Sequence, residues 1–333
     1  MSSTSCAISG YRAPSRTSTS ARWSTPGSRK AARRWASAPG PSTPTWARWK
    51  AIAWRWNSWA PPLPRVPEPV PGFLDRLARR ERIPERVVVV VAHPDDEVLA
   101  AGSRMNRMEN LTVIHLTDGA PRDMEDARRL GLSSRDDYGR MRRREVVAAM
   151  DALGADPELL CYWHPDKEAI LHGPAILDQL VEDLGEAQVV ITHAYEHGHP
   201  DHDTAALGVR LALRRLSADG REVPGVYEFP IYAIEGDRPV FGRFHPDPKS
   251  PETVLHLTEA ERARRDAALA EYRSQSGVLG FASQWEERLR PAPLYDFRQP
   301  APQGLAWYDR HGWDMTLARW REHANALLDR EGA

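Results

Sequence analysis

The sequence has 333 residues, and its 45 Lys and Arg side chains are nearly balanced by 46 Asp and Glu side chains, for a formal net charge of −1. The longest apolar run, the valines near residue 87, is far shorter than the about 18 apolar residues that a membrane-spanning helix requires. Two cysteines, Cys6 and Cys161, are too few for a disulfide scaffold or a thiolate zinc cluster, and they favour a reducing compartment such as the cytoplasm.

The near-zero net charge conceals two unlike parts. Residues 1–67 carry 11 basic side chains and no acidic one, whereas the rest of the chain has a charge of −12. The basic part also holds seven of the 12 tryptophans but shows no hydrophobic period, so residues 1–72 are interpreted as a disordered tail and Pro-rich linker, or as the product of a misplaced start. A tail that stacks on single-stranded nucleic acid and a targeting peptide are the less favoured alternatives.

Apolar strands and helices alternate in the next part of the chain. The predicted strands are 87–91, 111–116 (ended by Thr117-Asp118-Gly119), 159–163 and 188–192. The predicted helices are 97–108, 140–153, 175–184 and 204–216. This alternation predicts an α/β protein with a three-layer, Rossmann-like fold and a mainly parallel sheet over residues 80–235.

The remaining residues, 236–333, are expected to form an extension that shapes the substrate site. A strand is predicted at 226–232, just before this extension, and a charged helix at 258–274 within it. The extension is rich in aromatic residues, and their packing onto the core is favoured over stacking against a sugar.

Metal-ligand residue types cluster after the first and fourth predicted strands, at the edge where open α/β sheets bind their ligands. The first strand is followed by Ala92-His93-Pro94-Asp95-Asp96-Glu97, and the fourth by a segment that runs from His193 to Asp203. Imidazole and carboxylate groups together suit a divalent transition metal, zinc above all, with three protein ligands and an open position for water. His193 itself is expected to be a buried neighbour of the site, and Glu97 to cap the following helix.

The candidate ligands come from both segments. His93 and Asp96 lie on one turn that enters a helix, so they can converge on one point, and His202 can supply a third ligand from the other side. Asp95 is adjacent to a ligand but directed elsewhere, which leaves it free to take a proton from water.

The tripeptide His-Pro-Asp occurs four times, so the tripeptide alone does not identify a metal site. The copy at His245 lies outside the α/β alternation and is expected to be a turn. The copy at His164 follows a strand, but no second acid or histidine flanks it closely enough to complete a metal site. Only the copies at His93 and His199 are followed at once by another ligand-type residue.

Together the two motifs resemble the PIG-L/LmbE family of zinc-dependent N-acetylglucosaminyl deacetylases. The similarity spans residues 85–235 and includes Thr117-Asp118-Gly119 as well as Arg142 and Glu145, followed by Leu153-Gly154. The chain departs from the family in one respect: His197 stands where several members have a tyrosine.

The resemblance implies one zinc ion per chain, held by His93, Asp96 and His202. It also implies that Asp95 is the general base and that His199 stabilises the developing oxyanion or protonates the departing amine.

Three further residues receive roles from the resemblance. Asp201 would orient its neighbours, while Arg142 and Asp166 correspond to positions that contact a sugar in family members. For Arg142, a surface salt bridge is an equally favoured alternative.

The implied activity is zinc-dependent hydrolysis of the N-acetyl group of a small-molecule sugar conjugate that contains N-acetylglucosamine. The nearest alternative is an amidase that acts on a thiol-sugar conjugate or another N-acyl group. A metal-dependent phosphoesterase would usually require two metals and more bridging carboxylates. A non-enzymatic nucleic-acid binder, acting through the basic tail, is the remaining alternative and is not favoured.

Overall fold

The computed structural model describes residues 69–281, 284–302 and 304–333. The basic tail and most of the Pro-rich linker lie outside the described residues, so their interpretation stays a prediction. No helix within the described ranges combines the length and apolar character that spanning a membrane would require.

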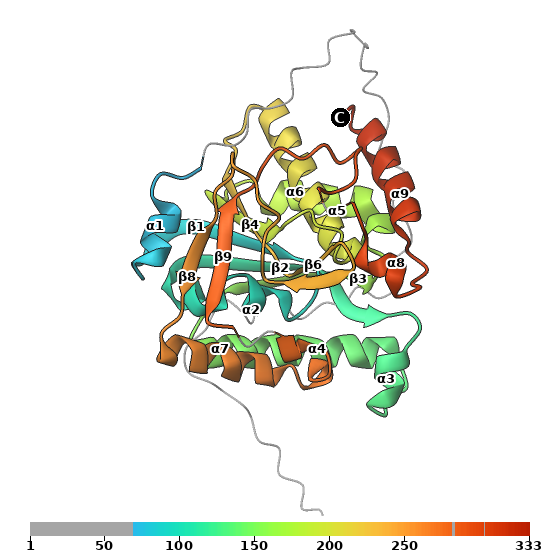
Figure 1. Ribbon diagram of the computed structural model, residues 1–333, viewed down its shortest axis with the longest axis horizontal. Helices are drawn as coiled ribbons and strands as arrows, with labels where there is room; N and C mark the ends of the chain where they lie inside the picture. Colours follow the sequence, from blue (N-terminus) through green and yellow to red (C-terminus); the bar gives the residue numbers. More distant parts are fainter. Residues whose placement is uncertain (1–68, 282–283, 303) are drawn as a thin grey trace, which may run out of the picture. The chain divides into compact units, whose positions relative to one another are not determined.

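A seven-stranded sheet forms the centre of the fold, with the strand order β3-β2-β1-β4-β5-β9-β8 (Figure 1). Neighbouring strands from β3 to β5 pair in parallel, and β9 and β8 extend the sheet in antiparallel fashion. The bounds are β1 (Ile83–Val91), β2 (Met108–Pro121), β3 (Glu158–Asp166), β4 (Val189–His193), β5 (Gly225–Phe229), β8 (Thr253–His256) and β9 (Glu286–Pro291). The predicted α/β class and mainly parallel sheet are confirmed.

The valine run of β1 explains why the sheet is buried on both faces. Val88 and Val90 pack into one hydrophobic cluster, whereas Val87, Val89 and Val91 pack into another. Because successive strand residues point to opposite faces, a continuous β-branched run suits a strand covered on two sides.

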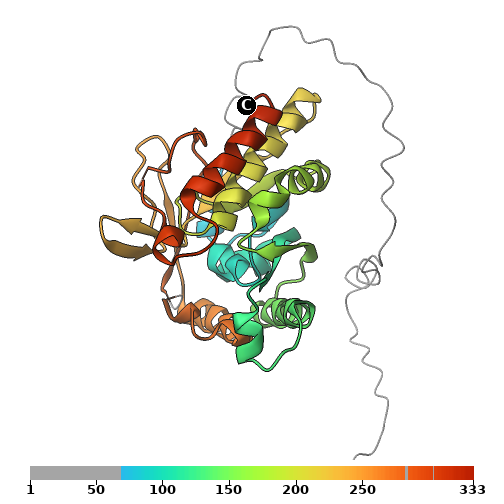
Figure 2. The ribbon, with the colours of Figure 1, turned by 90° about the vertical axis from the view of Figure 1, so that its right-hand side faces the viewer.

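Helices cover the two faces and complete the three layers (Figure 2). The helices of the first cluster are α5 (Gly173–Asp183), α6 (Pro200–Ala218) and α9 (Leu317–Arg330). Those of the second cluster are α1 (Phe73–Ala78), α2 (Asp96–Ala101), α4 (Arg135–Leu153) and α7 (Glu259–Glu271). The shorter elements are η3 (Gly102–Arg107), α3 (Glu125–Arg129), η4 (Ala169–His172), β6 (Tyr232–Glu235), β7 (Arg238–Phe241), η5 (Arg273–Gln275), η6 (Leu279–Phe281) and α8 (Trp307–Arg310).

Three of the predicted boundaries are wrong. The helix expected over 97–108 becomes 3-10 after α2, where the buried Arg104 donates to the Leu77 carbonyl. The strand expected over 226–232 divides at Pro230, which lacks an N–H, and β6 pairs with β7 in a separate sheet. β2 does not end at Thr117-Asp118-Gly119 but continues to Pro121 through an irregular pairing with β3.

The residues after β6 complete the main sheet and its layers. β9 pairs with β5, and α7 packs beside α4 on one face while α9 packs beside α6 on the other (Figure 1). Trp320 of α9 is fully buried, and its Nε1 donates to Thr204 Oγ1 at 3.0 Å. Trp285, by contrast, is 49% exposed. For Trp320, packing onto the core is therefore the observed role.

Replacing Trp320 with Ala is expected to lower the free energy of unfolding by about 3–5 kcal/mol, because it leaves a large cavity under α9 and removes the hydrogen bond that the ring donates to Thr204. Urea denaturation measures this change. Trp285→Ala is the matched control and should cost less than about 1 kcal/mol, since the ring is half exposed. Equal losses in the two variants would contradict the assignment of Trp320 to the core.

Candidate metal centre

The two ligand-rich segments meet at the carboxyl ends of β1 and β4. These strands pair in parallel, so the residues that follow them emerge at the same edge of the sheet. The chain proceeds from β1 to β2 on one side, whereas β4 lies on the other side, which makes this edge the switch point of the sheet. His93 follows β1, and His199 is the N-cap residue of α6.

The three predicted metal ligands are neighbours in space. Asp96 Oδ2 lies 3.2 Å from His93 Nδ1 and 3.5 Å from His202 Nε2. Ligand atoms about 2.0–2.1 Å from a tetrahedral zinc ion lie about 3.3 Å from one another, so these spacings suit a shared ion. All three side chains are buried, and His202 Nδ1 makes no hydrogen bond with the described residues. The donor types therefore suit zinc, although no group of ligand atoms within 4.8 Å of one another joins all three residues among those that the structure describes.

Potential ligand atoms form three overlapping groups within the described part of the chain, and the atoms of each group lie within 4.8 Å of one another. The groups are His93 with His199 and His202; His93 with Asp166, His199 and Asp201; and Asp96 with His193 and His202. The predicted ligands His93, Asp96 and His202 do not form one of these groups by themselves. Asp96 Oδ2 lies close to a ring nitrogen of each of the two histidines.

His193 supports the centre as a neighbour of His202. Its ring stacks on His202 with centroids 4.0 Å apart, and its Nε2 accepts a hydrogen bond from the Ala92 amide at 3.0 Å. Burial lowers the pKa of His193 to about 3, with His202 adding to the effect, so the ring stays neutral. Because the Nε2 lone pair is already used, that atom is a poor metal ligand.

Asp95 is held beside the donors in a strained backbone conformation, with φ at 122°. Its Oδ2 accepts from Arg142 Nη2 at 2.9 Å, and its amide donates to Glu97 Oε2 at 2.9 Å. Burial raises the pKa of Asp95 well above its usual range, while the Arg142 guanidinium opposes this shift. Arg142 itself is 3% exposed, so the alternative of a surface salt bridge is wrong.

Glu97 belongs to a buried polar network that the sequence did not indicate. Besides the Asp95 amide, its carboxylate contacts His115 Nε2 at 3.0 Å and accepts from the Tyr272 hydroxyl. The expected capping role is thus only part of its function, since Tyr272 follows α7, far along the chain. No local spacing could have identified this partner.

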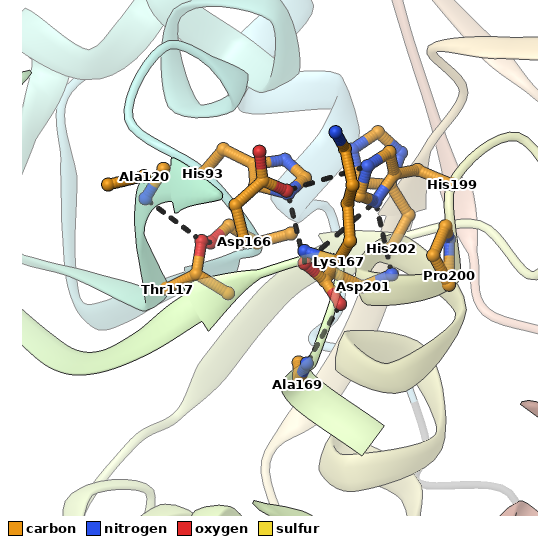
Figure 3. Close-up of polar contacts among 12 residues, drawn as sticks. His93, Thr117, Ala120, Asp166, Lys167, Ala169, His199, Pro200, Asp201 and His202 are labelled. Atoms are coloured by element: carbon orange, nitrogen blue, oxygen red, sulfur yellow. Dashed lines mark hydrogen bonds and ion pairs between the residues drawn. The ribbon is translucent and has the colours of Figure 1, made fainter. Parts of the chain in front are cut away.

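Asp201 ties His93 to the turn that follows β3 (Figure 3). Its Oδ2 lies 3.2 Å from His93 Nε2 and accepts from the Lys167 amide at 2.6 Å, while Oδ1 accepts from the Ala169 amide at 2.9 Å. A carboxylate that holds a ring nitrogen in this way fixes the tautomer of the histidine. It directs the other ring nitrogen of His93, Nδ1, toward Asp96.

His199 has a similarly defined orientation. Its Nδ1 accepts from the Asp201 amide at 3.1 Å, so the neutral ring carries its proton on Nε2. Burial, helped by the nearby His93, lowers the pKa of His199 well below its usual range. The ring also packs against Trp313, with centroids 4.9 Å apart.

Asp166, from the His-Pro-Asp copy at His164, lies in the same cluster through partners that do not flank it in the sequence. Asp166 Oδ1 lies 3.1 Å from His93 Nε2 and 3.6 Å from His199 Nε2. Flanking residues could not reveal this, because both partners come from other loops. The copy at His245 is an ordinary turn, as predicted, closed by the Ser250 amide on the Asp247 carbonyl at 3.0 Å.

His197, at the position where the resemblance suggests a tyrosine, is buried and has a hydrogen-bond partner inside the protein at each ring nitrogen. Its Nδ1 contacts Asp203 Oδ2 at 2.8 Å, and its Nε2 accepts from the Ala301 amide at 2.8 Å. Both ring nitrogens are therefore used inside the protein: Nδ1 pairs with α6, and Nε2 anchors the C-terminal segment.

The segment that carries these residues matches a known protein family. Residues 88–213, which contain both motifs, match the profile described as "PIG-L: GlcNAc-PI de-N-acetylase". This segment is a PIG-L family domain.

Two curated relatives of the PIG-L domain have the same description, 1D-myo-inositol 2-acetamido-2-deoxy-alpha-D-glucopyranoside deacetylase. The one from Nocardia farcinica is 28% identical over 167 residues, which is 42% of this chain and 56% of the relative. The one from Geodermatophilus obscurus is 29% identical over 164 residues, 40% of this chain and 53% of the relative. The chain thus spans about half the length of the curated relatives that it matches.

Solved structures also match part of the chain, at low identity. The A40926 pseudoaglycone deacetylase Dbv21 has a TM-score of 0.47 and 21% identity, over 62% of this chain and 96% of Dbv21. The N,N'-diacetylchitobiose deacetylase from Pyrococcus horikoshii has a TM-score of 0.42 and 16% identity, over 62% of this chain and 76% of that enzyme.

Asp96→Asn is expected to raise the zinc dissociation constant at least about 100-fold, because it removes the negative charge from the oxygen that joins His93 and His202. Isothermal titration of the metal-free protein measures this change. Asp118→Asn is the control, since Asp118 is also buried near the site but pairs with Arg135 at 2.5 Å and belongs to none of the three groups. An unchanged zinc affinity in Asp96→Asn would contradict the assigned centre.

Proposed function

We propose that this protein is a zinc-dependent deacetylase that hydrolyses the N-acetyl group of a small molecule containing N-acetylglucosamine. The observation that carries the proposal is the meeting of buried donors from His93, Asp96 and His202 beside the carboxylate of Asp95. The names of the curated relatives support an acetamido sugar as the substrate.

His93 Nδ1, Asp96 Oδ2 and His202 Nε2 would hold the zinc ion. When bound, zinc supplies Lewis-acid chemistry: it lowers the pKa of water to near 7 and polarises a carbonyl group. Asp201 accepts the proton on the opposite nitrogen of His93, so the lone pair of Nδ1 is available to the ion.

Asp95 takes the proton from the attacking water. Burial raises its pKa, which makes the carboxylate a stronger base, and the ion pair with Arg142 fixes its direction. Arg142 also donates to the carbonyls of Gly119 and Pro94. With three partners inside the protein, Arg142 acts by positioning Asp95 rather than by contacting the sugar.

His199 donates from Nε2 to the carbonyl oxygen as negative charge develops there. Its lowered pKa keeps the ring neutral, so its tautomer is fixed by the Asp201 amide. The departing amine is a poor leaving group until it is protonated, and the proton accepted by Asp95 is available for it. Asp166, whose side chain is 14% exposed beside His199, is placed to accept a hydrogen bond from a sugar hydroxyl.

Asp95→Asn is expected to lower kcat about 10²–10⁴-fold with zinc content unchanged, because it removes the base and leaves the donors in place. Acetate release from N-acetylglucosaminyl substrates with different aglycones measures activity, and elemental analysis measures the metal. Asp123→Asn, at an exposed carboxylate, is the control. Full activity of Asp95→Asn would refute the assigned base.

Glucosaminyl substrates that carry a larger N-acyl group, tested beside the N-acetyl compounds, separate the two acyl-hydrolase alternatives. Release of a larger acyl group in place of acetate would retain the zinc hydrolase and reject the deacetylase.

A further inference from the structure

The backbone of Asp95 is held by a buried carboxylate two residues along the chain, that of Glu97. Asp95 has φ at 122° and ψ at −30°, a conformation that a residue with a Cβ adopts only where its surroundings enforce it. Its amide donates to Glu97 Oε2 at 2.9 Å. Its side chain is held separately, by Arg142 Nη2 at 2.9 Å. The direction of the Asp95 carboxylate therefore depends on Glu97 as well as on Arg142.

Two donors from distant parts of the chain orient the Glu97 carboxylate. Arg143 Nη1 lies 3.1 Å from His115 Nδ1, and because a guanidinium can only donate, this ring nitrogen accepts. Burial lowers the pKa of His115, so the ring is neutral and its proton is on Nε2, which donates to Glu97 Oε2 at 3.0 Å. The other oxygen, Glu97 Oε1, accepts from the hydroxyl of Tyr272. Rotation of the carboxylate would therefore break hydrogen bonds at both oxygens.

Tyr272 has a fixed position because the segment that follows α7 is bonded to α4. Ser274 donates from its amide and from its hydroxyl to the two oxygens of Glu145, at 2.9 Å and 2.6 Å. Gln275 Nε2 donates to the Tyr138 hydroxyl at 2.8 Å. The ring of Tyr272 is fully buried beside these contacts, so its hydroxyl is a preorganised donor rather than a mobile surface group.

Helix α4 is thus the common support of both ends of Asp95. It carries Arg142, which holds the carboxylate, and Arg143, which orients His115. The same helix anchors the segment of Tyr272 through its own side chains. The amide and the carboxylate of Asp95 are therefore both positioned relative to one helix.

We propose that Tyr272 is a positioning residue for the general base: its hydroxyl holds Glu97, and Glu97 holds the backbone of Asp95. The role as a positioning residue rests on the proposed function, whereas the hydrogen-bonded link from Tyr272 to Asp95 does not. Without the hydroxyl, Glu97 Oε1 loses the donor that the described residues offer it, so the carboxylate can turn and release the Asp95 amide. Tyr272 lies beyond the matched residues 88–213, so the extension would contribute to the site through this contact.

Tyr272→Phe removes only the hydroxyl and keeps the packing of the ring. It is expected to lower kcat about 10–100-fold and to change KM less than about 3-fold, because the base is misdirected while the contacts to the sugar remain. Zinc content should be unchanged, since Asp96 accepts the His93 amide and is not bonded to Glu97. Acetate release and elemental analysis measure these changes.

The same substitution in an Asp95→Asn background separates positioning from a general structural effect. If Tyr272 acts through Asp95, the residual kcat should fall less than about 2-fold further, because the base is already absent. Tyr227→Phe is the matched control and should retain kcat. Tyr227 is fully buried in the same hydrophobic cluster, but its hydroxyl donates to the Val70 carbonyl at 3.2 Å.

Hydrogen exchange of the backbone amides of residues 93–97, followed by mass spectrometry of the full-length protein, tests the link without any substrate. Tyr272→Phe should speed this exchange at least about 10-fold and Tyr227→Phe should leave it unchanged, with circular dichroism confirming the fold of both variants.

Unchanged exchange in Tyr272→Phe would overturn the proposal, as would an unchanged kcat in a protein that releases acetate. An equal loss of kcat with and without the Asp95 carboxylate would overturn it too, because the effect would then not pass through the base. Faster exchange in a protein that releases no acetate would support the link from Tyr272 to Asp95 and reject the deacetylase function.

Discussion

The parallel pairing of β1 with β4 is the constraint on which the candidate site depends. It brings the turn after β1 and the start of α6 to one edge of the sheet, although His93 and His202 are more than a hundred residues apart in the chain. Each strand is buried on both faces, so a shift of register would move valines out of two cores at once. The hydrophobic effect that positions these strands therefore also positions the imidazoles.

Burial of so many ionisable groups is costly, and the structure offsets it by giving almost every group a specific partner. Asp95 has Arg142, Asp201 has two backbone amides and His93, and Glu97 has His115 and Tyr272. Among the described residues, His202 Nδ1 and Asp166 Oδ1 are two of the buried atoms without a hydrogen-bond partner, although Asp166 Oδ1 forms an ion pair with His93 Nε2 at 3.1 Å.

Much of the fold was predictable from the sequence, because the relevant signals are local. The valine run of β1 and the helix that ends at the left-handed Gly154 are read directly from residue types. The motif residues His93, Asp96 and His202 could also be placed, since each follows a strand or begins a helix. The missed features depend on distant partners: η3 forms around Arg104, which reaches back to Leu77.

The site residues also divide into those that a local motif predicts and those whose partners are distant in the chain. Residue spacing did not identify the partners of Asp166, because His93 and His199 lie in other loops. Tyr272 was not identified either, because it lies beyond the segment that matches the family. It contacts Glu97 only through the packing of α7. A motif records which side chains are near one another along the chain, whereas the completed polar network depends on tertiary packing.

The two nitrogens of His93 face carboxylates on opposite sides of its ring, Asp96 at Nδ1 and Asp201 at Nε2. A neutral imidazole is a donor at one nitrogen and an acceptor at the other, so a carboxylate on the Nε2 side determines what Nδ1 can bind. Asp201 supplies that carboxylate and is itself held by the turn after β3, which links the position of β3 to the state of the centre. His197, by contrast, uses both nitrogens inside the protein and is withdrawn from ligand chemistry. Residue type alone therefore does not decide which histidines can bind a metal; the partners of the second nitrogen do.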